Sequence, residues 1–257
     1  MRPRFLTSEK YNPRVWIVLV AALLTAATDV TDRQTRTVAL PQGKAVSIDV
    51  TIGNVRIDGW DKDVAEVVVE RRAPSTPQLM RVPLTIDDTP SRLAITARQS
   101  DGATDPAYRA DVTVRLPRAT LIELIQIVEG RLSVNGVNGS ITASVRRGPI
   151  DGKDISGAVR LSCEIGSITM SNATLVDTGV LRLRTFNGDI KLSLAATPAN
   201  ARIMALALNG TIRSDIPLTT KDTWGPRWSE ATLGKGEPVI SLDVVNGQIE
   251  IKSTVER

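Results

Sequence analysis

The sequence contains no histidine and a single cysteine, and only 3% of its 257 residues are aromatic. Without histidine, the chain can form neither a Ser-His-Asp triad nor a Cys-His pair, and it lacks the imidazole ligands of the usual metal centres. The one cysteine, Cys163, cannot form a disulfide within the chain, so packing alone must hold the fold together. The shortage of aromatic residues leaves Val, Ile, Leu and Ala to fill the core, and the β-branched residues among these favour strands.

The sequence also lacks a cluster of basic residues. The formal net charge is +4, but the residues before Thr28 contribute four positive and one negative side chain. The rest of the chain therefore carries about one net positive charge, without the basic stripe that marks nucleic-acid binding. We expect no nucleic-acid partner.

The N-terminal residues resemble an export signal. A basic stretch containing Arg2, Arg4, Lys10 and Arg14 precedes an apolar segment at 15–27 that ends in small residues. This segment is shorter than the about 20 apolar residues of a membrane-spanning helix. We predict that residues 1–27 are a signal peptide cleaved after residue 27. The alternative is a retained N-terminal membrane-anchor helix, and since no cysteine follows the segment, a lipid anchor is disfavoured. Either way we expect an exported protein, periplasmic, cell-surface or secreted.

A glycine followed two residues later by an aliphatic residue recurs along the chain. The copies begin at Gly53, Gly130, Gly139, Gly148, Gly157, Gly166, Gly188, Gly210 and Gly247. The step is nine residues from Gly130 to Gly166, and then 22, 22 and 37. Four of these glycines follow asparagine. Asn-Gly supplies the positive φ of a tight turn, and the alternating residues after it form a strand with one apolar face.

Each short strand alone buries too little apolar surface to be stable, so successive copies must stack into a shared core. A rung of two strands, about 18 to 22 residues long, fits both step lengths. We therefore predict an all-β, single-stranded β-solenoid with Asn-Gly turns over residues 28–257, as one continuous domain. A sandwich of plain hairpins is the alternative. Five further strands are predicted upstream, at 45–51, 54–58, 65–72, 93–97 and 110–116.

Alternation also predicts the surroundings of the cysteine. In the segment 159–165 every second residue is apolar, which places Leu161, Cys163 and Ile165 on one buried face. A small core residue is the interpretation that we favour for this thiol.

Three segments of the chain together are similar to the DUF4097 family, whose members are also called "putative adhesins". They are Gly53-Asn-Val-Arg-Ile-Asp-Gly-Trp-Asp, Leu183-Arg-Thr-Phe-Asn-Gly-Asp-Ile-Lys-Leu and the residues 234–251 near the C-terminus. The resemblance covers roughly residues 38–253. It implies a β-strand repeat solenoid on a bacterial envelope protein, and it brings no catalytic residues with it.

One copy of the repeat departs from the others. Arg182 and Arg184 occupy the outward positions before Asn187-Gly188, whereas the matching positions before Asn209-Gly210 are Met204 and Leu206. An apolar outward face is unusual.

The following step is about 15 residues longer than its predecessor, and the added residues include Trp224 and Trp228. We expect this insertion to fold over Met204, Leu206 and Leu208. It is either a cover for a sticky surface or a partner groove with tryptophan anchors.

No segment predicts a cofactor or a metal. The acidic residues at 58–63 lack the spacing of a calcium loop, and a turn between strands explains them better. Gly234-Lys235-Gly236 lacks the spacing of a phosphate loop. Paired carboxylates of a glycoside hydrolase are the remaining catalytic alternative.

We therefore expect a protein that is not an enzyme but a binding, adhesin-like or structural module. Its partner is an unknown envelope protein or a surface polymer, with membrane contact only through an uncleaved N-terminal segment. A membrane-tethered sensor or regulatory ectodomain is the alternative function.

Overall fold

The computed structural model describes residues 29–253 except 101, 103, 178 and 222–226. The predicted signal peptide or anchor helix, residues 1–27, lies outside these described residues. Strands form nearly all of the regular structure, and the one helix in the described part of the chain is the 3-10 turn η1 (Pro77–Arg81). None of the described residues belongs to a helix long and apolar enough to cross a membrane. The all-β prediction is confirmed.

The strands follow closely upon one another. The first ten are β1 (Val30–Ala39), β2 (Ala45–Ile52), β3 (Val55–Trp60), β4 (Val64–Ala73), β5 (Thr85–Asp88), β6 (Arg92–Ala97), β7 (Arg109–Pro117), β8 (Leu121–Glu129), β9 (Leu132–Asn135) and β10 (Ile141–Arg147). The others are β11 (Ile150–Lys153), β12 (Val159–Ile165), β13 (Ile168–Ala173), β14 (Val180–Asn187), β15 (Ile190–Leu194), β16 (Ala201–Ser214), β17 (Thr219–Lys221), β18 (Arg227–Leu233) and β19 (Val239–Ser253). The five strands predicted upstream of the repeat correspond to β2, β3, β4, β6 and β7.

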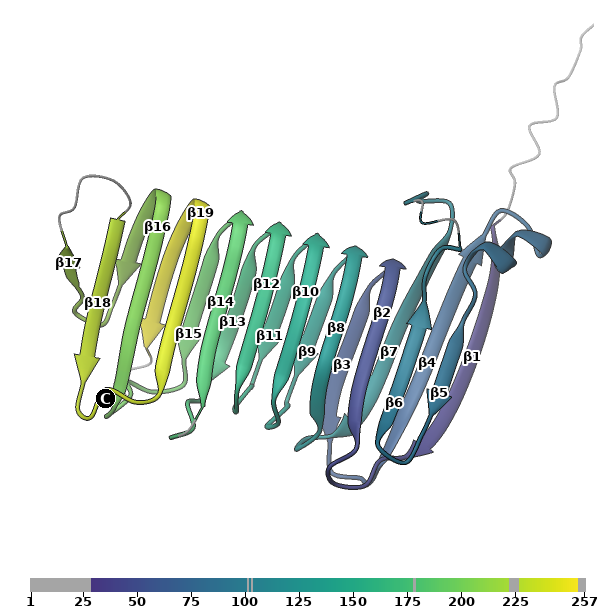
Figure 1. The fold of residues 1–257 in the computed structure, drawn as a ribbon, viewed down its shortest axis with the longest axis horizontal. Helices are drawn as coiled ribbons and strands as arrows, with labels where there is room; N and C mark the ends of the chain where they lie inside the picture. Colours follow the sequence, from purple (N-terminus) through teal and green to yellow (C-terminus); the bar gives the residue numbers. More distant parts are fainter. Residues whose placement is uncertain (1–28, 101, 103, 178, 222–226, 254–257) are drawn as a thin grey trace, which may run out of the picture.

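Consecutive strands alternate between two rows, and within a row each strand pairs in parallel with the strand two places along the chain. β8, β10, β12 and β14 belong to the first row, which we call row A. β9, β11, β13 and β15 belong to the second, row B. Figure 1 shows the strands side by side along the long axis of the molecule, from β1 at one end to β16–β18 at the other. This pairing rules out the predicted alternative of plain hairpins for these strands.

The register matches the repeat lengths in the sequence. Ile141 of β10 lies opposite Val159 of β12, 18 residues later, and Val159 lies opposite Leu181 of β14, 22 residues later. One turn of the chain through both rows thus takes two nine-residue steps or one 22-residue step. Both lengths lie in the range of 18 to 22 residues that the repeat in the sequence has.

Glycines stack at the corner where the chain passes from row A to row B. Gly148 has a φ of +133°, and a Cβ atom added to it would lie 2.0 Å from the carbonyl oxygen of Gly130. Gly166 would clash in the same way with Gly148, and Gly188 with Gly166. Only a residue without a side chain fits such close stacking of backbones. This explains why the repeat begins with glycine.

The last rungs do not stack in sequence order. β19 lies between β14 and β16, because it pairs in parallel with both. An added Cβ on Gly210 would therefore meet Gly247, and one on Gly247 would meet Gly188. The first rung behaves alike, since β2 lies between β6 and β8 and β3 lies between β7 and β9.

Antiparallel strands continue the rows at both ends. β4 pairs with β7 and β1 with β4 in row B, and β5 pairs with β6 in row A. At the far end of row A, β18 pairs with β16 and β17 with β18. These pairings satisfy backbone groups of strands that would otherwise be open edges.

The core lies between the rows and consists of stacked aliphatic columns. One column of row A follows the register through Ile48, Ile125, Ala143, Leu161, Leu183, Leu242 and Ala205, all buried. No tryptophan belongs to the buried core of the described residues, as the composition predicts.

The structure confirms that Cys163 and Leu161 are buried but corrects the prediction for Ile165, which is 48% exposed. Ile165 is the last residue of β12, and its register partners are Arg147 and Asn187 at the corner of the coil. The chain bends there toward row B, so the strict alternation of a straight strand no longer applies.

Candidate binding surface

The outward face of row A carries the residues that the repeat does not need for packing. We call the part of this face formed by β10, β12, β14, β19, β16 and β18 the outer A face. On β12 and β14 it presents Arg160, Arg182 and Arg184, all exposed, as predicted for the last two. The register places Arg160 directly beside Arg182 and Ser162 directly beside Arg184.

These three arginines differ from most other arginines of the protein. Several other strand arginines pair with a nearby carboxylate, as Arg56 does with Asp58 at 2.7 Å and Arg147 with Glu129 at 2.9 Å. Among the described residues, Arg160, Arg182 and Arg184 form no such ion pair. The acidic neighbour in their rows is Asp243, in register with Arg184. The centre of the outer A face is therefore positively charged.

A shallow groove runs beside these arginines. Its larger part, about 580 Å³, is lined by Ser144, Ser162–Ile165, Arg184, Phe186 and Asn187. A smaller part of about 150 Å³ adds Thr142, Arg160 and Arg182, and both parts share Ser144, Ser162 and Arg184. The lining includes serine, threonine and arginine side chains, but most of its exposed surface is apolar, and Phe186, 54% exposed, is among the lining residues. The groove offers hydrogen-bond donors and one apolar surface, but it is too shallow to enclose a ligand.

The apolar residues predicted as an interaction patch lie farther along the same face. Met204 and Leu206 neighbour Ser241 and Asp243 of β19, and Leu208, beyond them on β16, is 47% exposed. Trp224 lies outside the described residues. The structure brings Met204, Leu206, Leu208 and Trp228 together on one face.

Contrary to our expectation, the described strands of the insertion, β17 and β18, do not fold over this patch. Strand β18 of the insertion instead pairs with β16 in the plane of the sheet, antiparallel to it, with Trp228 opposite Leu206. Without β18, this edge of β16 would present a row of unpaired backbone N–H and C=O groups. The antiparallel strand β18 forms hydrogen bonds with them. A segment lying across the face of the sheet could not form these backbone hydrogen bonds. The insertion therefore widens the outer A face and leaves Leu208 exposed.

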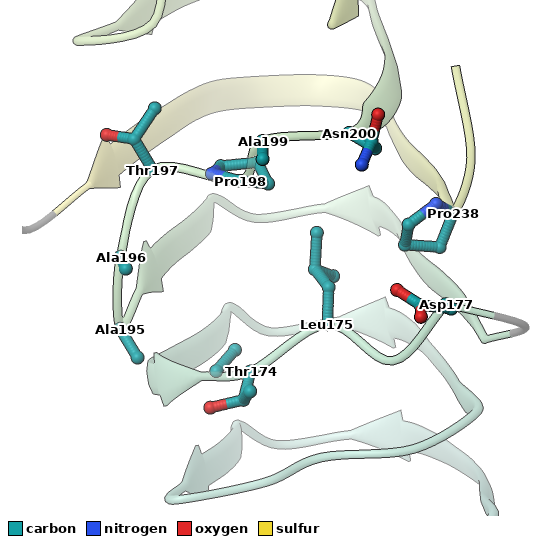
Figure 2. Close-up of a pocket in the computed structure, with 11 residues that line it drawn as sticks. Thr174, Leu175, Asp177, Ala195, Ala196, Thr197, Pro198, Ala199, Asn200 and Pro238 are labelled. Carbon is teal, nitrogen blue, oxygen red and sulfur yellow. The ribbon is translucent and has the colours of Figure 1, made fainter. Parts of the chain in front are cut away.

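A different pocket lies among the loops that join the rungs near the C-terminal end (Figure 2). It encloses about 220 Å³ between the segments 173–177 and 195–200 and Pro238. Alanine, threonine and proline dominate its lining, and Asp177 is the one ionisable residue in it. Figure 2 shows Leu175 projecting into the space between the two loops. A single carboxylate cannot provide the acid and base pair that glycoside hydrolysis needs.

The cysteine lies beneath the groove and is not suited to nucleophilic chemistry. Cys163 is buried, and its thiol donates a hydrogen bond to the carbonyl oxygen of Gly148, with Sγ and O 3.2 Å apart. Burial raises the pKa of this thiol to about 11. At neutral pH it is therefore protonated, whereas a nucleophile requires the thiolate.

Residues 61–63 of the acidic segment form the predicted turn between β3 and β4, whereas residues 58–60 are the end of β3 itself. Asp61 pairs with Arg118 at 2.9 Å and Asp58 with Arg56, so both carboxylates have cationic partners. The indole N–H of Trp60 donates to the carbonyl oxygen of Val64 at 2.8 Å. Within the described ranges, no three acidic or thiol side chains converge as metal ligands would.

Sequence reasoning identified Arg182 and Arg184 as outward but missed Arg160 and the groove. The 22-residue step between Gly166 and Gly188 is the signal that could have found them, because it places Arg160 beside Arg182.

No protein-family model and no curated protein matches the sequence. Three solved structures are similar in part. A "putative cell adhesion protein" from Clostridium sporogenes is 12% identical, with 88% of this chain and 100% of that chain covered and a TM-score of 0.46. A "putative adhesin" from Bacteroides fragilis is 11% identical, with 87% and 97% covered and a TM-score of 0.46. A "putative lipid binding protein" from Parabacteroides distasonis is 12% identical, with 86% and 96% covered and a TM-score of 0.33. Similarity at this level carries no conclusion about what this chain does.

Proposed function

We propose that this protein is a non-catalytic, exported β-solenoid of the bacterial cell envelope that binds its partner through the outer A face. One observation carries the proposal. Arg160, Arg182 and Arg184, which form no ion pair among the described residues, share a single face with the exposed side chains of Phe186 and Leu208. Exposed apolar residues beside charged ones are typical of contact surfaces.

The solenoid interpretation is supported by the alternation of consecutive strands between two rows and by the stacked glycines at the corner. Such a coil is rigid, because each rung is held by backbone hydrogen bonds to its neighbours on both sides. It can therefore present a long, flat face with fixed spacing between side chains. A flat face suits an extended partner better than a small substrate.

Export is supported by the basic and apolar residues at 1–27. If that segment is cleaved, the coil is released into the periplasm or to the cell surface. If it is retained, the coil becomes a membrane-tethered ectodomain, which fits a sensor or regulatory role. The mass of the mature N-terminus in the native host separates the two alternatives.

Co-sedimentation with cell envelopes of the host tests the binding role. The double variant F186A/L208A removes two exposed apolar side chains from the outer A face. Met80, 81% exposed on η1 at the other end of the molecule, gives a matched control in M80A. We expect the double variant to sediment at least tenfold less than the wild type and M80A to sediment equally. Equal sedimentation of all three proteins would show that the outer A face is not the contact surface.

A further inference from the structure

We propose that Arg160, Arg182 and Arg184 bind the carboxylate groups of an acidic polysaccharide lying in the groove of the outer A face. This inference rests on the proposed binding function and names the ligand class that the groove selects.

The arrangement of the arginines is unfavourable without an anion. Arg160 and Arg182 are direct neighbours on adjacent parallel strands, about 4.8 Å apart along the hydrogen-bonding direction. Like charges in such positions destabilise a sheet. Arg184 adds a third positive charge two residues along β14, about 7 Å from Arg182. Asp243 offsets one charge at most, because it neighbours Arg184 and Arg160 lies two strands away.

Elsewhere, some arginines are neutralised by a carboxylate on a neighbouring strand. Arg131 of the β8–β9 loop pairs with Asp151 of β11, and Arg115 of β7 pairs with Glu66 of β4 at 3.5 Å. At the positions of Arg160 and Arg182 no carboxylate of the described chain takes that role. An external anion can do so, and guanidinium groups bind carboxylates by two parallel hydrogen bonds.

The lining of the groove indicates a sugar polymer as the source of the carboxylates. Thr142 and Ser144 place short hydroxyl groups beside the arginines, where they can bond to the hydroxyls of a sugar. The Ser162 hydroxyl donates to the carbonyl oxygen of Ala143 at 3.3 Å and can accept a further hydrogen bond. The exposed ring of Phe186 provides an apolar surface for the face of a sugar ring. Because strand spacing sets the distance between Arg160 and Arg182, a chain with regularly repeated charges can contact both.

A membrane surface fits this region less well. Glu164, which pairs with Arg146 at 3.4 Å, and Asp243 flank the arginines and would repel a flat anionic bilayer. A narrow polymer can contact the arginines in the smaller part of the groove, which neither Glu164 nor Asp243 lines. The groove also lacks the depth that an acyl chain would need.

Titration with two forms of one polymer tests the inference. Polygalacturonate carries a carboxylate on each sugar, whereas its fully methyl-esterified form has the same backbone without charge. By isothermal titration calorimetry we expect the purified protein to bind polygalacturonate at least tenfold more tightly than the ester, with affinity falling as salt rises.

Variants locate the site. R160Q/R182Q should weaken binding of polygalacturonate at least tenfold, and R160K/R182K, which keeps the charge but not the forked geometry, should lie between it and the wild type. R56Q, which removes an arginine of row B that pairs with Asp58, should bind like the wild type. All three substituted arginines are exposed, so circular dichroism should show the same fold in every variant.

Three results would overturn the inference. They are equal affinity for the two polymers, unchanged binding by R160Q/R182Q, and binding to phosphatidylglycerol vesicles without binding to polygalacturonate. If envelopes still bind the protein through Phe186 and Leu208 while polygalacturonate does not bind, the ligand class is wrong and the proposed function stands. If neither envelopes nor polymer bind, both proposals fail.

Discussion

The side-chain amide of Asn246 donates a hydrogen bond to Oδ1 of Asn187, with Nδ2 and Oδ1 2.7 Å apart, although 59 residues separate the two in sequence. Asn209 in turn donates to Oδ1 of Asn246 at 2.9 Å. The three asparagines precede three glycines of the corner and form a ladder across β14, β19 and β16. This ladder lies where β19 enters between strands that precede it in the chain, and it helps to fix the register there.

Replacing the middle asparagine should therefore weaken the C-terminal rungs. Asn246→Ala removes both amide hydrogen bonds, and we expect the free energy of unfolding to fall by about 1 kcal/mol, a modest value because the asparagines are exposed. Asn135→Ala is the control, since Asn135 is also exposed at a strand end but lies outside this ladder. It should change stability by less than about 0.5 kcal/mol. Urea denaturation measures the free energy of unfolding of both variants. Equal losses of stability would show that the asparagine ladder does not stabilise the C-terminal rungs.

Backbone stacking at the corner predicts a larger effect. In Gly148→Ala the new methyl group would meet the Gly130 carbonyl oxygen, and the residue would also have to hold a positive φ. We expect a loss of about 3 kcal/mol or more. Gly43→Ala separates the two causes, because Gly43 has a φ of +90° but nothing within 4 Å of the added atom. Its loss should be about 1–2 kcal/mol in the same urea experiment. A smaller loss for Gly148→Ala than for Gly43→Ala would contradict the close stacking.

The buried thiol gives the protein a dependence on alkaline pH. Because burial raises the pKa of Cys163 to about 11 in the folded protein, the unfolded chain loses this proton at lower pH than the folded chain does. The stabilisation is complete below the ordinary thiol pKa of about 8.5 and is lost as pH rises toward 11. We expect the free energy of unfolding to fall by about 2–3 kcal/mol over this window, and Cys163→Ala to flatten the profile. Parallel profiles for the two proteins would show that the thiol is not the cause.

The described strand β18 of the insertion should stabilise the edge of β16. Trp228 lies opposite Leu206 across the β16–β18 pair, and such a pair contributes about 0.2–1 kcal/mol. We expect Trp228→Ala to lower the melting temperature by a few degrees and to speed hydrogen exchange at the paired backbone of Ala205 and Ser229. An unchanged melting temperature together with lost envelope binding would favour the predicted partner groove.

Local features of the fold could be predicted from the sequence because each depends on a few adjacent residues. Gly188 and Gly247 have the positive φ predicted for Asn-Gly, whereas Gly139 and Gly210 do not, and β16 runs without a break through Asn209-Gly210. Alternation decides which side chains of a strand point inward. The order of the rungs could not be predicted, because Gly210 and Gly247 begin almost identical repeats. Which of them lies next to Gly188 depends on β18 pairing with the edge of β16, and that is a long-range choice.

The candidate surface was predictable only in part for the same reason. The apolar residues Met204 and Leu206 stand out because they break a local pattern. Arg160 fits its pattern, and it becomes notable only when the register places it beside Arg182 without a carboxylate nearby. The exposure of Ile165 was missed because the strand bends at its last residue, which alternation cannot show.

Hydroxyl-radical footprinting of the protein bound to host envelopes tests the central claim, that the outer A face is the contact surface. Phe186 and Met204 lie on this face, whereas Met80 is highly exposed at the far end of the molecule and serves as an internal reference. We predict that binding slows oxidation of Phe186 and Met204 severalfold and leaves that of Met80 unchanged. Protection of Met80 with continued oxidation of Phe186 and Met204 would contradict the account.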